Sequence, residues 1–144
     1  MTVHTRMAAA AAVAFFLAAA PTAATETRPE ASLSLELNDL SDSAVGCRAT
    51  FIARNALPVR LDAIAFEVVL FDADGRVDRL LVLDFGSLAP DKTRVRQFEL
   101  QDARCDGISR VLVNDAVCRG VGVEPHICIE RLETSTRAPV EFGS

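Results

Sequence analysis

The sequence contains neither tryptophan nor tyrosine, and its only aromatic residues are eight phenylalanines. Sugar-binding β-sandwiches usually rely on Trp and Tyr, which combine a flat apolar ring with a polar group, so glycan recognition is not favoured. The sequence also lacks a glycine-rich phosphate loop, a Gly-x-Ser-x-Gly elbow and a His-Glu-x-x-His motif. No Cys-x-x-Cys pair occurs, which argues against a thioredoxin-like redox centre. We therefore expect a protein that is not an enzyme, and a hydrolase of unfamiliar type is the least favoured alternative.

Residues 1–24 have the pattern of a secretory signal peptide, which begins with a short basic region at Arg6 and ends with the small residues Thr22-Ala23-Ala24. The apolar stretch between them, Ala8–Ala20, is about 13 residues long, whereas a membrane-spanning helix needs about 20. No Arg-Arg pair is present, so general secretion is favoured over the twin-arginine route. We expect cleavage near Ala24, a periplasmic or secreted location, and no stable membrane insertion after cleavage.

The remaining 120 residues, 25–144, are enough for one domain with a modest core. They contain fourteen basic and twenty acidic residues, which corresponds to a net charge of −6. An acidic balance does not favour nucleic acid or an anionic membrane as the main partner. We expect a flexible leader over residues 25–32, a β-sandwich domain over 33–133 and a polar C-terminal tail over 134–144.

The strongest pattern in the domain is a β-hairpin from Leu61 to Leu88. Its arms, Ile64–Phe71 and Val77–Phe85, are rich in β-branched and aromatic residues, which favour strands. The turn Asp72–Gly75 supplies the Asp and Gly that hairpin turns prefer. Both faces of the first arm are mostly apolar, so we expect a central strand that is covered on both sides or lies at a sheet–sheet contact. One face carries Ile64, Phe66, Val68 and Leu70, and the other carries Ala65, Val69 and Phe71.

Shorter strand patterns, separated by turn residues, recur along the rest of the domain. Further strands are expected at Leu33–Leu37, Cys47–Asn55, Thr93–Leu100 and Ile108–Val113, with a bulge between Val95 and Phe98 where the alternation slips. Ile129–Leu132 fits a last strand or a short helical turn, and Val140–Phe142 is a candidate edge strand. No helical periodicity occurs. The sequence therefore predicts an all-β protein, an immunoglobulin-like antiparallel β-sandwich of about seven strands that is stapled by disulfides.

Several of these stretches resemble a group of small exported alphaproteobacterial proteins, usually labelled only as Tat-pathway signal sequence domain proteins. The resemblance covers most of the chain after residue 24, although this sequence lacks the twin arginine of that label, and it implies no assigned activity. The hairpin with its Asp-x-Asp-Gly turn also resembles the bacterial immunoglobulin-like domains of the FxLYD type. The stretches that carry the first resemblance are Phe71–Val77, Leu83–Phe85, Arg94–Phe98, Cys105, Arg110–Asn114 and Cys118.

All four cysteines lie after the expected cleavage site, and an even number in an exported protein indicates two disulfides. Four cysteines allow three pairings, and the topology favours one of them. Cys47 begins a strand that an immunoglobulin-like sandwich pairs antiparallel with Thr93–Leu100, so Cys105, just beyond the end of that strand, lies close to Cys47. Cys118 and Cys128 flank a glycine-rich loop that they can close locally. We therefore predict the pairs Cys47–Cys105 and Cys118–Cys128.

Two patterns invite a metal or nucleophile interpretation. Asp72 and Asp74, with Asp78 beyond, alternate as in a calcium loop, but the EF-hand's Glu at the twelfth position and its flanking helices are missing, and Asp-Gly suits a plain hairpin turn. His126 lies two residues before Cys128, but a zinc site needs four ligands and a Cys–His nucleophile needs a free thiolate. We interpret the aspartates as turn residues and His126 as a surface residue beside a structural cysteine, so no metal or cofactor is predicted.

The late part of the domain carries a local basic stretch. It fits a solvated face or a strand edge that discourages aggregation, or alternatively a docking patch for an acidic partner. The stretch consists of Lys92, Arg94, Arg96, Arg104 and Arg110.

We expect the protein to act by contact with an unidentified protein of the cell envelope, for example as an accessory or assembly factor. The alternative is a small periplasmic binder of a metal or ligand, which would use the aspartate turn or the Cys118–Cys128 loop.

Overall fold

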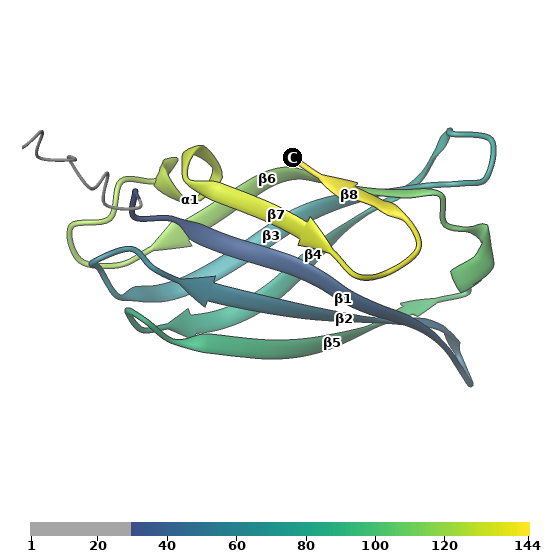
Figure 1. The fold of residues 1–144 in the computed structure, drawn as a ribbon, viewed down its shortest axis with the longest axis horizontal. Helices are drawn as coiled ribbons and strands as arrows, with labels where there is room; N and C mark the ends of the chain where they lie inside the picture. Colours follow the sequence, from purple (N-terminus) through teal and green to yellow (C-terminus); the bar gives the residue numbers. More distant parts are fainter. Residues whose placement is uncertain (1–29) are drawn as a thin grey trace, which may run out of the picture.

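The computed structural model describes residues 30–144, so the expected signal peptide and most of the expected leader lie outside the described residues. The described chain folds into two four-stranded sheets that pack face to face (Figure 1). The prediction of an all-β sandwich is confirmed, with eight strands in the place of about seven. Sheet A has the order β5-β2-β1-β7, formed by Thr93–Gln101, Gly46–Asn55, Leu33–Ser43 and Leu132–Thr136, and sheet B has the order β4-β3-β6-β8, formed by Val77–Leu88, Leu61–Phe71, Arg110–Arg119 and Glu141–Gly143.

The predicted hairpin forms β3 and β4, and β3 lies in the interior of sheet B between β4 and β6, antiparallel to both. Ile64, Phe66, Val68 and Leu70 alternate along β3 and are at most 2% exposed. Their side chains therefore face sheet A, as the alternation of apolar residues predicted.

Phenylalanines dominate the space between the sheets. The rings of Phe66 and Phe85, both from sheet B, meet edge to face with centroids 5.3 Å apart. Phe51 of β2 reaches across from sheet A and meets Phe85 at 6.5 Å, also edge to face. All three rings are at most 2% exposed. Burying such a side chain stabilises a fold by roughly 2–3 kcal/mol, so this cluster is a main source of cohesion between the sheets.

The C-terminal segment corrects the expected domain boundaries, because residues 134–144 are not a tail but part of the sandwich. β7 runs parallel to β1 from Leu33↔Leu132 to Leu37↔Thr136, and β8 runs parallel to β6. The polar sequence of β7 concealed this role, because an edge strand needs few apolar residues to pair through its backbone. The candidate strand at Val140–Phe142 forms one residue later, as Glu141–Gly143.

The bulge expected in β5 is absent, because β5 pairs with β2 without interruption from Gly46↔Gln101 to Arg54↔Thr93. The alternation slips for another reason. Arg94 and Arg96 occupy positions opposite Ala53 and Phe51, which belong to the inner face of β2. β5 is therefore a regular strand, and its alternation slips because two charged residues occupy inward positions at the open edge of the sandwich.

The next two elements are longer or different from the expected ones. β6 extends to Arg119, so Cys118 lies within the strand and not beyond its end. The short helix α1, Ile127–Glu130, corresponds to the helical-turn interpretation of this stretch, and β7 follows it directly.

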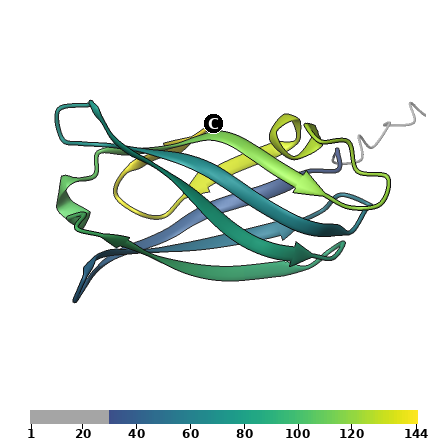
Figure 2. The same cartoon turned by 180° about the vertical axis from the view of Figure 1, so that it is seen from behind.

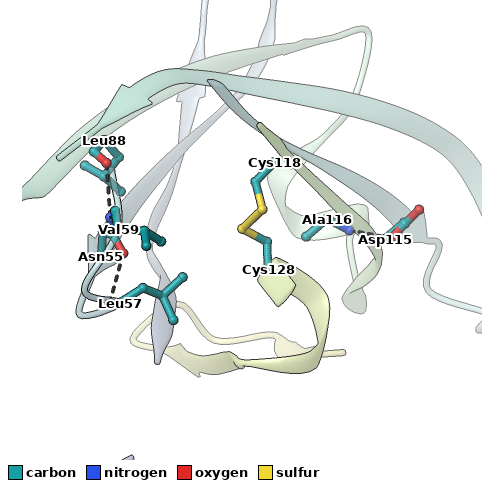
Figure 3. The surroundings of a disulfide bond; sticks show 8 residues. All are labelled: Asn55, Leu57, Val59, Leu88, Asp115, Ala116, Cys118 and Cys128. Carbon is teal, nitrogen blue, oxygen red and sulfur yellow. Dashed lines mark hydrogen bonds between the residues drawn. A yellow bond between two sulfur atoms is a disulfide. The ribbon is translucent and has the colours of Figure 1, made fainter. Parts of the chain in front are cut away.

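The two disulfides join Cys47 to Cys105 and Cys118 to Cys128, which is the predicted pairing. The first bridge, with a Cα–Cα distance of 5.0 Å, ties the start of β2 to the 3₁₀ turn η1, Cys105–Gly107. The second, at 6.1 Å, ties the end of β6 to α1 (Figure 3). The two bridges therefore hold opposite ends of the sandwich.

Asn55, at the end of β2, is fully buried and uses every polar group that it has. Its side-chain Nδ2 donates to the carbonyl oxygens of Val59 and Leu88, at 2.9 and 3.1 Å, and its Oδ1 accepts from the N–H of Leu57 at 3.0 Å (Figure 3). Its backbone N–H donates to the Lys92 carbonyl, and its carbonyl accepts from the N–H of Asp91. One residue therefore connects the crossover from sheet A to sheet B with the loop that returns from β4 to β5.

We expect loss of the long disulfide to cost more stability than loss of the short one. The bridges have sequence separations of 58 and 10, for which the chain-entropy model gives about 4 and nearly 3 kcal/mol. Urea denaturation of Cys47→Ala/Cys105→Ala and Cys118→Ala/Cys128→Ala measures both costs without leaving an unpaired thiol. An equal or larger cost for the second pair would contradict the expectation.

Asn55→Ala should destabilise the protein by about 2–4 kcal/mol, because it leaves the Val59 and Leu88 carbonyls and the Leu57 N–H without their partner in a buried site. Asn55→Asp should also destabilise the protein, since a carboxylate cannot donate hydrogen bonds to the two carbonyl oxygens. Thermal and urea unfolding measure the effect. Asn38→Ala is the control, because Asn38 is only partly buried and makes a single side-chain hydrogen bond, to Glu36; a similar loss in both variants would mean that the buried network contributes little.

Candidate functional site

The outer faces of the two sheets differ in chemistry. On sheet A, side chains of neighbouring strands satisfy one another: Arg48 pairs with Glu99 at 2.6 Å, and Gln97 donates to Thr50 Oγ1 at 3.2 Å. The exposed Val95 is the exception on this face. This surface is typical of the solvent-facing side of an antiparallel sheet.

The outer face of sheet B carries several exposed apolar side chains. Val77, Leu80, Val82 and Val117 are 50–68% exposed, and they make up four of the seven exposed large hydrophobic residues in the described chain. Figure 2 views the molecule from this side and shows that, within residues 30–144, no helix or loop crosses the outer surface of β3, β4 and β6. The sequence predicted a central strand that is covered on both sides or lies at a sheet–sheet contact, and β3 lies at such a contact. On its outer side Val69 is 6% exposed, whereas the neighbouring Leu80 of β4 is 57% exposed.

Strand pairing arranges the outer face of sheet B in four rows that run across β6, β3 and β4. Two rows contain carboxylates, the third is wholly apolar, and the fourth contains an arginine. In order along β3 the rows are Val117–Ala65–Asp84, Asp115–Glu67–Val82, Leu112–Val69–Leu80 and Arg110–Phe71–Val77.

A β-bulge shapes the acidic end of this face. The register between β3 and β6 shifts at Glu67/Val68, so Asn114 and Asp115 lie together opposite Glu67 and both are exposed. Asn114 Nδ2 donates to Glu67 Oε1 at 2.5 Å. The Asp115 side chain points away from the Cys118–Cys128 disulfide and accepts from the Ala116 N–H (Figure 3). The bulge therefore places a carboxylate pair, Glu67 and Asp115, at one end of an apolar surface.

The basic end is formed by Arg110, whose guanidinium carbon lies 5.4 Å from the centre of the Phe71 ring in a cation–π arrangement. A hollow of about 430 Å³ adjoins these two residues at the tip of the β3–β4 hairpin, and Asp74 and Glu141 also line it. Among the described residues, neither Arg110 nor Glu67 nor Asp115 makes an ion pair. The charges at both ends of the face therefore remain available to a partner.

The five basic residues singled out in the sequence do not form one patch. Lys92, Arg94 and Arg96 lie at the start of β5, whereas Arg104 follows the other end of that strand and Arg110 lies on the outer face of sheet B. Arg104 contacts Asp106 at 2.6 Å, and this hydrogen bond lowers the pKa of the Asp106 carboxyl. The five residues are close in sequence, but the strands place them on different surfaces, so the expectation of a single basic patch is wrong.

Arg94 and Arg96 close the open edge between the sheets. A guanidinium nitrogen of each lies 3.4 Å from the carbonyl oxygen of Phe85, beside Gly86. Gly86 has a φ of 69°, a conformation that other residues rarely adopt, and it marks an irregularity in the β3–β4 pairing. Inward-directed charges at sheet edges hinder pairing with another chain's strand. This arrangement agrees with the edge interpretation of the basic stretch.

The aspartate turn has a structural role. Asp72 Oδ1 accepts from the N–H groups of Asp74 and Arg76, both at 2.9 Å, and Gly75 adopts a positive φ of 74°. Asp74 lies 3.8 Å from the guanidinium of Arg76. Within residues 30–144, no three His, Cys, Asp or Glu side chains are grouped closely enough to hold a metal ion.

His126 immediately precedes α1, and Cys128, its neighbour in sequence, is part of a disulfide. The thiolate that a Cys–His nucleophile requires is therefore absent at this position. In the described part of the chain, no helix has the length and apolar character needed to cross a membrane.

Comparison with known proteins supports the fold alone. No family model matches the chain, and no curated protein matches it. A solved structure, that of IrmA from Escherichia coli, is similar with a TM-score of 0.54 over 73% of this chain and 92% of the other, at 10% sequence identity. The chain therefore shares its sandwich architecture with that protein, and at this identity the similarity carries no inference about activity.

Asp72→Ala should destabilise the protein by about 1 kcal/mol, because it removes the oxygen that accepts both turn N–H groups. Asp74→Asn should change stability by less than about 0.5 kcal/mol, since Asn suits the turn equally well. Urea denaturation measures both. Calorimetric titration with Ca²⁺ should show no saturable heat, and binding tighter than about 1 mM, the range of extracellular calcium modules, would show that the carboxylates hold a cation.

Proposed function

We propose that this chain is an exported, non-enzymatic interaction module that binds another protein of the cell envelope through the outer face of sheet B. The observation that carries the proposal is the set of exposed apolar side chains on the outer face of sheet B, Val77, Leu80 and Val82 of β4 and Val117 of β6. The sequence of β3 is that of a strand buried on both sides, yet Leu80 and Val82 beside it are 57% and 68% exposed. Contiguous apolar surface with a polar rim is typical of protein contact sites.

Export is proposed from two independent features. The pattern of residues 1–24 is that of a signal peptide. The two disulfides, Cys47–Cys105 and Cys118–Cys128, are of a kind that persists in oxidising compartments such as the periplasm or the extracellular space. A role as an accessory factor in the envelope follows from that location together with the contact face.

The composition of the face suits a transient contact more than a permanent one. Full burial of a Val or Leu side chain is worth roughly 1.5–3 kcal/mol, so four half-exposed side chains would contribute about 4 kcal/mol before the cost of association. The remaining affinity must come from the charged rim, and rim charges mainly set orientation and association rate.

A photo-crosslinking residue in place of Leu80 should capture a protein partner in the envelope of cells that export the chain. The same residue in place of Val95 is the matched control, because both side chains are 57% exposed and lie on edge strands, but of different sheets. We expect a discrete adduct from position 80 that is lost when Val82→Asp is added, and none from position 95. Equal labelling from both positions, or none from either, would refute the proposed contact face.

A further inference from the structure

On β6, β3 and β4 the carboxylates Asp115, Glu67 and Asp84 lie on one side of the apolar row Leu112–Val69–Leu80, and Arg110 lies on the other. Glu141 of β8 pairs with Arg110 in the register, and Arg119 lies beyond Val117. Asp115 and Glu67 occupy the row on one side, and Arg110 occupies the row on the other. On β6 the acidic and the basic residue are thus at similar distances from the apolar row. The acidic side of this face can therefore pair with the basic side of an identical face.

Two identical faces can pack with a two-fold axis in the plane between them. The strands of the two copies then align when this axis runs either along the strands or across them. If the axis runs along the strands, each row lies over the same row of the other copy, and Glu67 lies over Glu67. If the axis runs across the strands along Leu112–Val69–Leu80, the acidic row lies over the basic row. Asp115 of each copy then lies opposite Arg110 of the other, twice by symmetry. Because like charges at close range are repulsive, only the second orientation is electrostatically favourable.

We propose that the occupant of this face is a second copy of the chain, related by a two-fold axis that runs across the strands through Leu112, Val69 and Leu80. This inference rests on the proposed function and names the partner of its contact face. In this arrangement β3 lies over β3 and β4 over β4, with the strands of the two copies antiparallel. The interface is isologous, so it closes and buries the same surface on both copies.

The apolar side chains match in the same orientation. Leu80 lies on the axis and meets Leu80, and Val82, one row to one side, meets Val77, one row to the other. These three residues are 57%, 68% and 55% exposed in the single chain, so all three lose water on association. Glu67 meets the Phe71 ring and the guanidinium that lies over it. In this orientation the apolar side chains therefore meet apolar side chains, and Glu67 meets a cation.

Other surfaces of the described chain are less suited to a second copy. At the edge of β5 the inward guanidinium groups of Arg94 and Arg96 hinder pairing with a strand of another chain. The outer face of sheet A is occupied by pairs such as Arg48–Glu99 that would have to be desolvated. The outer face of sheet B is therefore the surface that self-association would use.

The size of the contact predicts its strength. In this orientation three of the four rows lie over one another, and three strands about 4.8 Å apart with three rows about 6.8 Å apart outline roughly 14 by 20 Å, or about 300 Å² per copy. Stable interfaces bury about 800 Å² per partner. We therefore expect a dissociation constant of roughly 10–1,000 μM. A high local concentration, at a membrane surface or in the narrow periplasm, would favour the dimer.

Sedimentation velocity of the exported protein, purified with its disulfides intact, tests the inference over about 5 μM to 1 mM. We expect concentration-dependent dimers. Leu80→Asp should weaken dimerisation at least about 10-fold, because it places two carboxylates together on the axis. Val95→Asp, the control of equal exposure on sheet A, should leave dimerisation unchanged. A monomer throughout the range, or equal loss in both variants, would overturn the inference.

A charge exchange tests the direction of the axis. Arg110→Asp and Asp115→Arg should each weaken dimerisation by about 10-fold, because each places like charges opposite one another. The double variant Arg110→Asp/Asp115→Arg restores opposite charges across the axis and should recover the dissociation constant to within about 3-fold. Circular dichroism checks that each variant is folded. Failure of the double variant to recover, with its fold intact, would rule out this orientation.

The crosslinker at position 80 separates failure of this inference from failure of the proposed function. An adduct of twice the chain mass, containing only this chain, supports self-association. An adduct with a different protein, together with monomeric sedimentation, would overturn self-association and leave the contact face standing. No adduct and monomeric sedimentation would overturn both.

Discussion

The fold depends on how the chain passes from one sheet to the other, and Asn55 controls that passage. Its amide holds the Val59 and Leu88 carbonyls and the Leu57 N–H, while its backbone bonds to Asp91 and Lys92. Two of the three crossings between the sheets at this end, β2 to β3 and β4 to β5, therefore meet at one buried side chain. Since a buried polar group without a partner is costly, this network favours one arrangement of the two loops.

Much of this fold could be predicted from local patterns. The β3–β4 hairpin, the inner face of β2 and the disulfide pairing follow from alternation, turn residues and strand order. What could not be predicted depends on partners distant in sequence. β7 pairs with β1 across about a hundred residues and shows no alternation of its own, and Asn55 looks like any strand end until the loops around it are in place. The same is true of Arg94 and Arg96, whose inward positions resembled a bulge.

The candidate face was visible in the sequence but was interpreted only in part. The apolar residues on both sides of β3 indicated a strand that is covered on both sides or lies at a sheet–sheet contact, and nothing in a single sequence says whether a cover on the outer side comes from the same chain. The basic residues were the more conspicuous signal, yet strand geometry disperses them. The acidic end of the face depends on the bulge at Asn114 and Asp115, which brings two residues to one side where simple alternation predicts only one.

The pairing of β7 with β1 and of β8 with β6 also bears on when the protein can fold. The last two strands complete one edge of each sheet, so neither sheet can be finished until nearly the whole chain is present. A polypeptide that is threaded through a membrane from its N-terminus would thus stay incomplete until the last strand emerged. Contacts of such high sequence separation form slowly, so the topology itself delays compaction of a chain that becomes available from its N-terminus.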